Sequence, residues 1–353
     1  MKIVHLAETL EVGGAEKLVA SLCRWQREQG QDVSVQCLYR VGWLGEELRK
    51  EKFDILLHEP GGKADWIASI YRELKRLKPD VLHCHNATAA ILGAIPARAA
   101  GVKRIVVTRH GGIARPYAIR KELKFTLAAR WCDWIVAVCE EARRNLIAAP
   151  FSTRRKIVRI YNAVCAPRPT GAELPVKSGF TLLTVARLSP AKDQQTLLRA
   201  FAIAKARVTD LQLWIVGDGS LRTELQALAQ QIGLNGSVTF FGEKADVAPF
   251  LESADLFTLS SVTEGLPLSL LEAMAAGVPS IVTKVGGMTE VANLSAATVA
   301  VPASNPIALA DAIEIMAQSR DQLPFLGTVA RQCHAANFTF DRMAKEYAAL
   351  YAN

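Results

Sequence analysis

Two glutamates with seven residues between them, Glu264 and Glu272, stand where the sequence predicts that a strand is followed by a helix. The apolar run at 255–259 is typical of a short buried strand, and 268–276 is predicted to form a helix that Gly277 ends. The free N–H groups at the start of such a helix attract anions such as phosphate. An anion site flanked by two carboxylates suits a ligand with phosphates and many hydroxyls, and a nucleotide sugar is such a ligand.

Two basic residues, Arg187 and Lys192, follow another predicted strand of the same half. A lysine at a helix start opposes the helix dipole, so Lys192 favours an anionic partner nearby. Both cations would stabilise negative charge on a departing diphosphate. The alternative is a surface arginine and an ordinary helix-start lysine. The loops hold no Asp-x-Asp pair and no His/Asp cluster with metal-ligand spacing, so this chemistry requires no metal cofactor.

Residues that follow the predicted strands of the first half could also contact a ligand. Gly13 and Gly14 follow the first predicted strand and would let the backbone approach a phosphate, although glycine pairs also form plain turns. His110 lies beyond a strand end, beside two glycines. Of the two histidines near the end of the strand at 81–84, we expect one to face the ligand: His83 is taken as structural and His85 as facing the acceptor.

Strands alternate with helices along the whole chain, which predicts an α/β fold with parallel sheets and helices on both faces. All strands of a parallel sheet point their carboxyl ends the same way, so the polar residues above are expected to face one cleft between two domains. The expected strands are 2–6, 32–38, 54–57, 81–84, 104–108, 134–138 and 156–160, then 180–185, 211–216, 238–241, 255–259, 280–283 and 297–301.

Length and composition predict two domains. A chain of 353 residues exceeds the size of one ordinary core. Three prolines and two glycines fall within 165–179, which is typical of an interdomain linker. We therefore expect an N-terminal domain at 1–164, a C-terminal domain at 180–335, and a last helix within 336–353 that packs back across the first domain.

The seven cysteines are odd in number and scattered, without a C-x-x-C pair, which favours a reduced cytoplasm over disulfides or zinc. The start of the chain lacks the pattern of a signal peptide, because acidic residues follow its first strand at once. The most apolar window, 87–97, is about half the length that a membrane span needs. The sequence therefore indicates a cytoplasmic protein, with peripheral attachment to the inner face of the cytoplasmic membrane as an extension of this prediction.

Charge differs between the two halves. Residues 1–168 hold 29 lysines and arginines against 17 acidic residues, a net charge of +12, whereas residues 169–353 hold 13 against 17, a net charge of −4. Within 98–130 nine basic residues face a single acid, Glu122. Such a run is commonly a solvated face, and it also suits an anionic membrane surface or an anionic lipid-linked acceptor. Nucleic acid is disfavoured, because aromatic residues do not interleave with the basic ones.

Together these motifs resemble those of the retaining glycosyltransferases of family 4. That resemblance implies the GT-B fold, in which two Rossmann-like, doubly wound domains face each other across a cleft. It runs over nearly the whole chain, and the segment from Glu264 to Glu272 with the run at 273–279 is its most specific part. The other matching segments are Gly13-Gly14-Ala15-Glu16, Thr108-Arg109-His110, the turn at 160–164, and Arg187 with Lys192.

The resemblance implies a role for each matched residue. Glu264 would hold hydroxyls of the transferred sugar, and Glu272 would bind the ribose. The backbone of Gly265, Leu266, Pro267 and Leu268 would hold the diphosphate together with Arg187, Lys192, Gly13 and Gly14, while Gly242 and Glu243 would lie near the nucleobase. His110 would lie near the reacting centre, and we place Glu16, His85, Arg109 and Asn162 on the acceptor side. It also implies retention of anomeric configuration, with a phosphate oxygen of the leaving group assisting deprotonation of the acceptor.

The sequence departs from the family pattern at three places. Ala163 stands where the family commonly has glycine after the asparagine of its turn, and Ala186 stands where glycine commonly precedes the arginine. Both replacements are small and leave the predicted roles intact. The glycine-rich stretch expected after the Glu290 helix is replaced at 293–297, so that loop is expected to be altered.

We therefore expect a hexosyltransferase that moves a sugar from a nucleotide diphosphate donor to an acceptor hydroxyl. The expected acceptor is a lipid-linked glycan of the cell envelope, in polysaccharide or lipopolysaccharide biosynthesis. Two alternatives stay open: a nucleotide-sugar epimerase on the same architecture, and a non-catalytic subunit that binds a nucleotide sugar. A dehydrogenase is disfavoured, because the loop after the first strand lacks a full G-x-G-x-x-G fingerprint.

Overall fold

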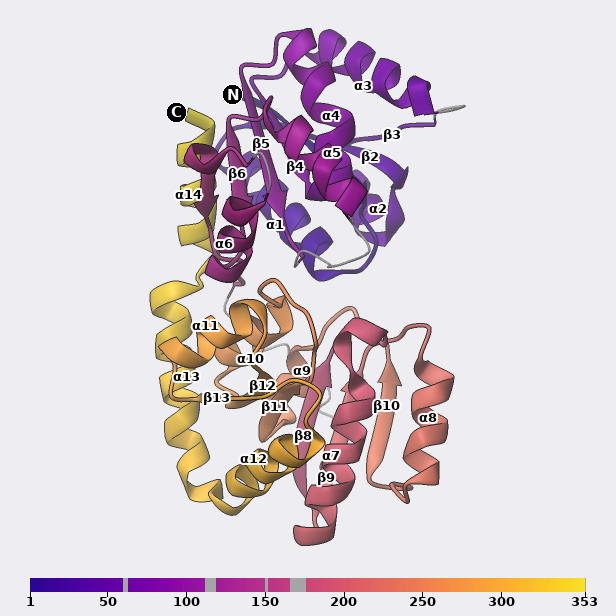
Figure 1. Cartoon of the computed structure of the whole chain (residues 1–353), viewed down its shortest axis with the longest axis vertical. Coiled ribbons are helices and arrows are strands. Elements are labelled where there is room, and N and C mark those ends of the chain that lie inside the picture. The colour runs from indigo at the N-terminus through magenta and orange to yellow at the C-terminus, as the bar shows by residue number, and fades with distance from the viewer. Residues whose placement is uncertain (60–62, 112–118, 150–151, 166–175, 353) are drawn as a thin grey trace. The chain divides into compact units, whose positions relative to one another are not determined.

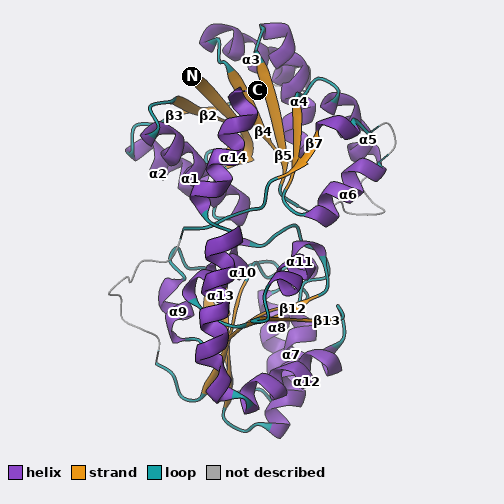
Figure 2. Ribbon diagram, turned by 90° about the vertical axis from the view of Figure 1, so that its left-hand side faces the viewer, coloured by secondary structure: helices purple, strands orange, loops and turns teal. Residues whose placement is uncertain are grey.

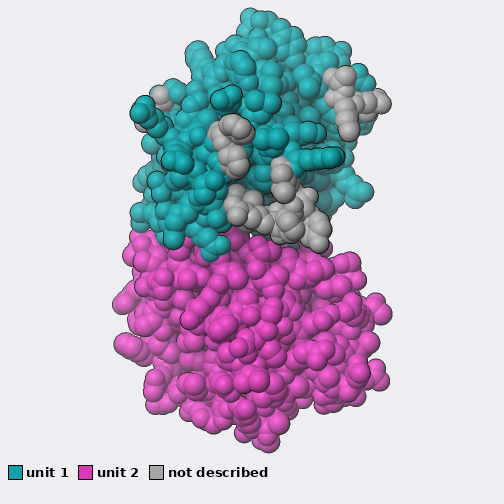
Figure 3. Space-filling view, in the orientation of Figure 1, with its two compact units in different colours: residues 1–162, 341–353 teal, residues 163–340 magenta. Residues whose placement is uncertain are grey.

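A computed structural model of the chain describes residues 1–59, 63–111, 119–149, 152–165 and 176–352 (Figure 1). Contacts divide it into two compact units (Figure 3): unit 1 comprises residues 1–162 and 341–353, and unit 2 comprises 163–340. The sequence predicts divisions after 164 and 335 instead. Of the linker predicted at 165–179, residues 166–175 lie outside the described part of the chain.

Unit 1 is built on a parallel sheet with the strand order β3-β2-β1-β4-β5-β6-β7. Its strands are β1 (Lys2–Thr9), β2 (Asp32–Arg40), β3 (Asp54–Leu57), β4 (Val81–His85), β5 (Arg104–Arg109), β6 (Trp134–Ala137) and β7 (Ile157–Arg159). Its helices are α1 (Gly14–Glu28), α2 (Gly42–Lys50), α3 (Lys63–Leu77), α4 (Asn86–Ala100), α5 (Ile119–Ala129), α6 (Glu140–Ala148) and the C-terminal α14 (Phe340–Ala352), of which Phe340 groups with unit 2.

Unit 2 carries a second parallel sheet, with the order β10-β9-β8-β11-β12-β13. Its strands are β8 (Phe180–Val185), β9 (Leu211–Val216), β10 (Val238–Gly242), β11 (Leu256–Leu259), β12 (Ser280–Thr283) and β13 (Thr298–Val301). Its α-helices are α7 (Gln194–Arg207), α8 (Arg222–Gln231), α9 (Ala248–Ser253), α10 (Leu268–Ala276), α11 (Gly286–Leu294), α12 (Pro306–Gln318) and α13 (Leu323–Asn337).

In each sheet the chain reverses its direction of winding once, beside the first strand. In unit 1 the reversal lies between β1 and β4, and in unit 2 it lies between β8 and β11, which pair directly. Loops leaving two such strands diverge to opposite faces, and the crevice at their carboxyl ends is where open α/β sheets bind ligands. The residues after these four strands are therefore the candidates for a ligand site in each unit.

Helices cover both faces of the unit 1 sheet (Figure 2). On one face α4 packs so closely that a Cβ atom on Gly93 would lie 2.5 Å from Leu6 and 3.3 Å from the Cys84 sulfur. On the other face side chains of α1 and α14 reach the strands: Gln26 contacts His5, and Tyr351 contacts His83. This second face positions the polar residues of unit 1 that are described below.

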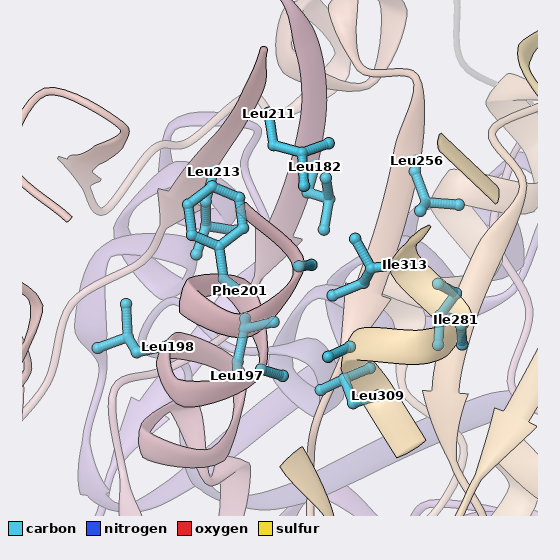
Figure 4. Packing of buried hydrophobic residues seen from close by; sticks show 14 of the residues in the cluster. Leu182, Leu197, Leu198, Phe201, Leu211, Leu213, Leu256, Ile281, Leu309 and Ile313 are labelled. Atoms are coloured by element: carbon cyan, nitrogen blue, oxygen red, sulfur yellow. The ribbon is translucent and has the colours of Figure 1, made fainter. Parts of the chain in front are cut away.

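Unit 2 is held by a large apolar core between its sheet and helices α7 and α12 (Figure 4). Leu182, Leu213 and Leu256 from three strands lie against Phe201 of α7 and Ile313 of α12, and all five side chains are buried. A rigid base of this kind fixes the loops at the strand ends. Among the described residues, no helix is both long and apolar enough to cross a membrane.

Helices α2, α5, α6, α9 and α13 were not predicted from the sequence. The last of these carries Pro324 in its first turn, where proline fits without breaking a helix, but its apolar spacing is weak. In contrast, the helix predicted at 268–276 and its end at Gly277 are confirmed: α10 has these bounds, and Gly277 has the left-handed φ of 80° that ends a helix.

Candidate functional site

In unit 2, Glu264 and Lys192 form an ion pair at the carboxyl ends of β11 and β8. The Lys192 ammonium donates to Glu264 Oε1, and the Ser261 hydroxyl donates to the same oxygen at 2.7 Å. Only 22% of the Lys192 side chain and 10% of the Glu264 side chain are exposed. A carboxylate held by two donors in a shielded place has a fixed orientation, which is what the recognition of a sugar hydroxyl requires.

The loops that carry this pair are joined by hydrogen bonds. The Ser260 hydroxyl donates to the carbonyl oxygens of Lys192 and Asp193 at 2.9 Å each, and the Val262 N–H donates to the Ala191 carbonyl at 3.0 Å. The carboxylate of Asp193 in turn caps helix α7 through the Thr196 N–H and hydroxyl. The two loops therefore form one surface at the end of the sheet.

Helix α10 begins beside Glu264 and directs its first N–H groups toward the same edge. Pro267 is the N-cap and supplies no side-chain acceptor, and Leu268 begins the helix. The N–H groups of a first turn have no partner within the helix, so they can hold phosphate oxygens. The arrangement agrees with the diphosphate role predicted for the backbone from Gly265 to Leu268, although Leu266 and Leu268 themselves bury their side chains.

Gly286 holds the other side of this loop. Its φ is +53°, and a Cβ atom there would lie 2.2 Å from the Glu264 carbonyl oxygen. Next to it, the Gly287 N–H donates to the Gly265 carbonyl at 2.6 Å. The backbone of α11 thus approaches the Glu264 segment so closely that a side chain at 286 is excluded.

Arg187 and Glu272 lie near this pair along the chain but in different surroundings. Arg187 is exposed, and its carbonyl accepts a hydrogen bond from the buried Gln194 side chain at 2.9 Å, which fixes the backbone and leaves the guanidinium outward. Glu272 is half-buried in the second turn of α10. Both positions are compatible with donor contacts, and their roles stay predictions.

Gly217, Asp218 and Gly219 serve packing at the end of β9. A Cβ atom on Gly217 would lie 2.0 Å from the Ala186 carbonyl oxygen, and one on Gly219 would lie 2.3 Å from that of Leu188. The Asp218 carboxylate accepts from the Gly219 N–H at 2.7 Å and from Arg222 at 2.6 Å, and these bonds lower its pKa. Asp218 is therefore a turn residue.

Gly242 and Glu243, predicted near the nucleobase, end β10. Gly242 has a φ of +71°, and its carbonyl accepts from the Gly217 N–H at 2.8 Å. Glu243 is exposed. The hydrogen bond places both glycines at the same edge of the sheet as the Glu264 loop.

In unit 1, Gly13 and Gly14 begin helix α1. Gly13 is its N-cap in an extended conformation, and a Cβ atom there would lie 2.2 Å from Glu16 Oε2. Glu16 therefore folds back over the first turn of its own helix, in the position of a capping glutamate, which weakens the case for its acceptor-side role. Gly14 is exposed at the first position of the helix, and its role toward a phosphate stays a prediction.

His110 ends a chain of hydrogen-bonded side chains that crosses the interior of unit 1. Gln26 Oε1 lies 2.8 Å from His5 Nε2, His5 Nδ1 lies 2.9 Å from His85 Nε2, and His85 Nδ1 lies 3.1 Å from His110 Nε2. His5 and His85 are buried, and His110 is half-buried at the end of β5. His85 is thus an internal link behind His110, which argues against direct contact with an acceptor.

His83 and His85 lie on the same face of the sheet, which corrects the expectation that only one would face the site. Residues two apart on a strand point the same way, and their ring centroids are 4.2 Å apart. His83 bonds to the Tyr351 hydroxyl at 2.7 Å and to the Thr108 hydroxyl at 2.8 Å. Its structural role agrees with these partners.

Burial keeps these histidines neutral. Desolvation lowers the pKa of His5 and of His110 to about 4, from an ordinary value of 6.5. It lowers the pKa of His83 and His85 well below the ordinary value, and the neighbouring histidines lower it further. At neutral pH each ring therefore has one N–H donor and one lone-pair acceptor.

Among the described residues, His5, His83 and His85 bring three ring nitrogens within 4.8 Å of one another, a spacing that could hold a metal ion. All six of their nitrogens, however, already have hydrogen-bond partners on protein side chains. A cation would have to break several of these bonds. The donor set is satisfied as a hydrogen-bond network.

Arg109 and Asn162 were assigned to the acceptor side. The Arg109 guanidinium instead makes a two-pronged pair with Glu122, at 3.0 and 2.8 Å, and lies over the Phe125 ring. Only 8% of its side chain is exposed, so it holds α5 against β5. Asn162 follows β7 and is buried. Neither position supports an acceptor contact directly.

Sequence reasoning missed His5, Gln26, Tyr347 and Tyr351. The two tyrosines come from α14: Tyr351 joins His83 to Gln26, and the Tyr347 hydroxyl lies 3.0 Å from that of Thr108. His5 could have been recognised from the sequence, because a histidine in the middle of the apolar strand 2–6 is buried and needs polar partners. The partners lie up to 325 residues apart, so local patterns do not reveal them.

Comparisons with known proteins agree with this architecture. Residues 12–166 match the family model described as Glycosyltransferase Family 4, and residues 172–331 match the one described as Glycosyl transferases group 1. The chain is 32% identical over 242 residues to a UDP-Gal:α-D-GlcNAc-diphosphoundecaprenol α-1,3-galactosyltransferase of Escherichia coli, covering 63% of this chain and 62% of that enzyme. It is also 27% identical over 352 residues to the putative glycosyltransferase EpsD of Bacillus subtilis, covering 93% and 91%.

A solved structure of Anabaena HepE in complex with UDP-glucose has the same fold. The two chains superpose with a TM-score of 0.87 at 20% identity, over 100% of this chain and 99% of HepE. At that identity the likeness concerns the fold: two parallel sheets of seven and six strands, as predicted.

Proposed function

Because this chain belongs to the glycosyltransferases of family 4, we propose that it transfers a hexose from a uridine diphosphate sugar to a hydroxyl of a lipid-linked glycan, with retention of configuration. The observation that carries the proposal is the shielded ion pair of Lys192 and Glu264 at the switch point of the unit 2 sheet. The UDP-galactose donor of the E. coli relative and the UDP-glucose bound to HepE support the choice of base.

The two members of the pair have complementary roles in this proposal. Glu264 accepts hydrogen bonds from hydroxyls of the transferred sugar, in an orientation fixed by Lys192 and Ser261. Lys192, with Arg187 and the first N–H groups of α10, stabilises charge that grows on the diphosphate as the bond to the sugar breaks. In the retaining step, the acceptor oxygen bonds to the anomeric carbon on the face that the diphosphate leaves, and a phosphate oxygen takes the acceptor proton.

A donor screen with lipid-linked acceptors tests this function. UDP-glucose, UDP-galactose, UDP-N-acetylglucosamine and GDP-mannose are each incubated with enzyme and polyprenyl-diphosphate glycans, and released nucleotide and glycan mass are measured. We expect release of UDP that depends on acceptor. Conversion of the donor without acceptor would indicate an epimerase, and donor binding without any release would indicate a non-catalytic subunit.

We also propose that helix α5 docks unit 1 on an anionic membrane, where a lipid-linked acceptor resides. Leu123, Leu127 and Trp131 are exposed by 54%, 59% and 47%, and their spacing of four residues places them on one side of the helix and the turn that follows it. The exposed basic residues around them are Arg120, Lys121, Lys124 and Arg130. Apolar side chains flanked by cations are typical of helices that lie in a membrane interface.

A further inference from the structure

The hydrogen bonds that link Gln26, His5, His85 and His110 all run in one direction, and the Gln26 amide sets that direction. An amide oxygen can only accept a hydrogen bond, so Gln26 Oε1 requires a proton on His5 Nε2. A neutral His5 then has a lone pair on Nδ1, which accepts from His85 Nε2. The same logic gives His85 a lone pair on Nδ1, which accepts from His110 Nε2.

The amide nitrogen of Gln26 lies on the other side, toward Tyr351. Its Nε2 donates to the Tyr351 hydroxyl at 3.4 Å, and that hydroxyl can then donate to His83 Nδ1 at 2.7 Å. Turning the amide by 180° would reverse every bond of the chain, because each neutral ring has a single proton to give. The network therefore has two self-consistent arrangements, and the contacts given above correspond to the one in which Gln26 Oε1 accepts from His5 Nε2.

These tautomers determine the state of His110, the last residue of the hydrogen-bonded series. With its proton on Nε2, His110 has a lone pair on Nδ1, and this atom is buried without a hydrogen-bond partner among the described residues. The backbone at this position is fixed by a second contact, since the backbone N–H of His110 donates to Asn86 Oδ1 at 3.0 Å. A buried acceptor with no partner lowers stability, and a ligand hydroxyl would satisfy it.

We propose that Gln26, His5 and His85 are positioning residues that hold His110 as a hydrogen-bond acceptor for a hydroxyl of the bound sugar. The ligand part of this proposal rests on the proposed function, whereas the tautomer does not. An acceptor-only nitrogen selects for O–H groups and against groups that present only lone pairs, such as a carboxylate. The chain of histidines thus adds a preference for neutral hexoses over uronic acids at this position.

The tautomers can be measured by NMR, because the protein has only six histidines. Long-range ¹H–¹⁵N spectra of ¹⁵N-histidine-labelled protein at pH 7.5 are assigned with single histidine variants. We expect neutral rings with the proton on Nε2 for His5, His85 and His110. A proton on His110 Nδ1 in the native protein would overturn the proposal without any measurement of activity.

Two variants separate positioning from folding. Gln26→Met removes the anchor of the chain and should give His110 a mixture of tautomers, with kcat/KM for the sugar donor lower by about tenfold, the value of one hydrogen bond. Ser69→Ala removes a hydrogen bond from His58, a histidine of unit 1 that does not belong to this series, and should leave the His110 spectrum and kcat/KM near native. Equal kinetic losses in both variants, with unchanged His110 spectra, would refute the positioning role.

Titration of the protein with a nucleotide-sugar donor tests whether a sugar hydroxyl contacts His110. UDP-sugar should shift the His110 Nδ1 resonance, whereas UDP alone should not. Donor binding by calorimetry without this shift would exclude the hydroxyl contact. No binding of any nucleotide sugar would instead contradict the proposed function, and the spectra of the native protein would still decide the tautomer.

Discussion

Glu264 lies in a loop beside Lys192 and Ser261, whereas Glu272 lies in the second turn of α10, and we predict different kinetic defects for their removal. Glu264→Gln loses the charge that Lys192 and Ser261 orient, so we expect kcat to fall by about 10²–10³ with a smaller change in donor KM. Glu272→Gln should raise the donor KM by about tenfold with kcat largely kept, the effect of one lost charged hydrogen bond. Steady-state kinetics with donor and acceptor varied separately measures both, with the exposed Glu252→Gln as control. Identical defects in the two variants would contradict the division.

Substitution of Gly286 gives a second prediction at the scale of single residues. A left-handed residue other than glycine costs about 1–2 kcal/mol, and Gly286→Ala adds a clash with the Glu264 carbonyl oxygen. We expect it to lower the free energy of unfolding by more than Gly233→Ala, whose φ is +77° but whose Cβ would meet nothing within 4 Å. Urea unfolding measures stability, and only Gly286→Ala should also raise the donor KM. Equal effects of the two substitutions would show that the close approach at 286 has no functional weight.

At the scale of elements, helix α5 of unit 1 presents exposed apolar and basic side chains, and we predict that it binds an anionic membrane. Leu123→Ser with Leu127→Ser, and Lys121→Glu with Lys124→Glu, should each reduce binding to vesicles that contain anionic lipid by about tenfold or more, because apolar burial and charge both contribute. Ile307→Ser with Ile315→Ser removes equally exposed apolar residues from α12 and serves as the control. Co-sedimentation at low and high salt measures binding. Attachment that ignores lipid charge and survives high salt would contradict the proposal.

At the scale of the whole molecule, acid should unfold unit 1 first. Five of the six histidines belong to unit 1, and burial lowers the pKa of each, to about 4 for His5 and His110. Between pH 6.5 and about 4 the unfolded chain binds protons that the folded unit does not, so stability falls as pH falls, by about 1.4 kcal/mol per pH unit for His5 and for His110. Trp214→Phe leaves tryptophans only in unit 1, so their fluorescence during urea unfolding reports this unit. Stability that stays constant from pH 7 to pH 5 would show that the histidines are not buried and neutral.

Local sequence patterns were sufficient for most of the architecture. The period of apolar residues predicted the alternating strands and helices, and glycine at 277 ended α10 where predicted, because a helix end depends on its own few residues. The same patterns placed Glu264, Lys192 and His110 after the ends of strands. The carboxyl ends of parallel strands lie at one edge of a sheet, so these residues were expected at such edges. The family resemblance added roles to these positions, and the family and fold are confirmed by the comparisons.

The sequence by itself determined which residues follow each strand and therefore which could meet a ligand. The tertiary structure alone decided their partners. Lys192 and Glu264 are 72 residues apart and pair because β8 and β11 are neighbours. Gln26, His5, His85 and His110 join because α1 packs on one face of the sheet, and His83 meets Tyr351 because the C-terminal helix returns to it. Contacts of this kind depend on which distant elements pack together, and periodicity along the chain carries no information about that choice.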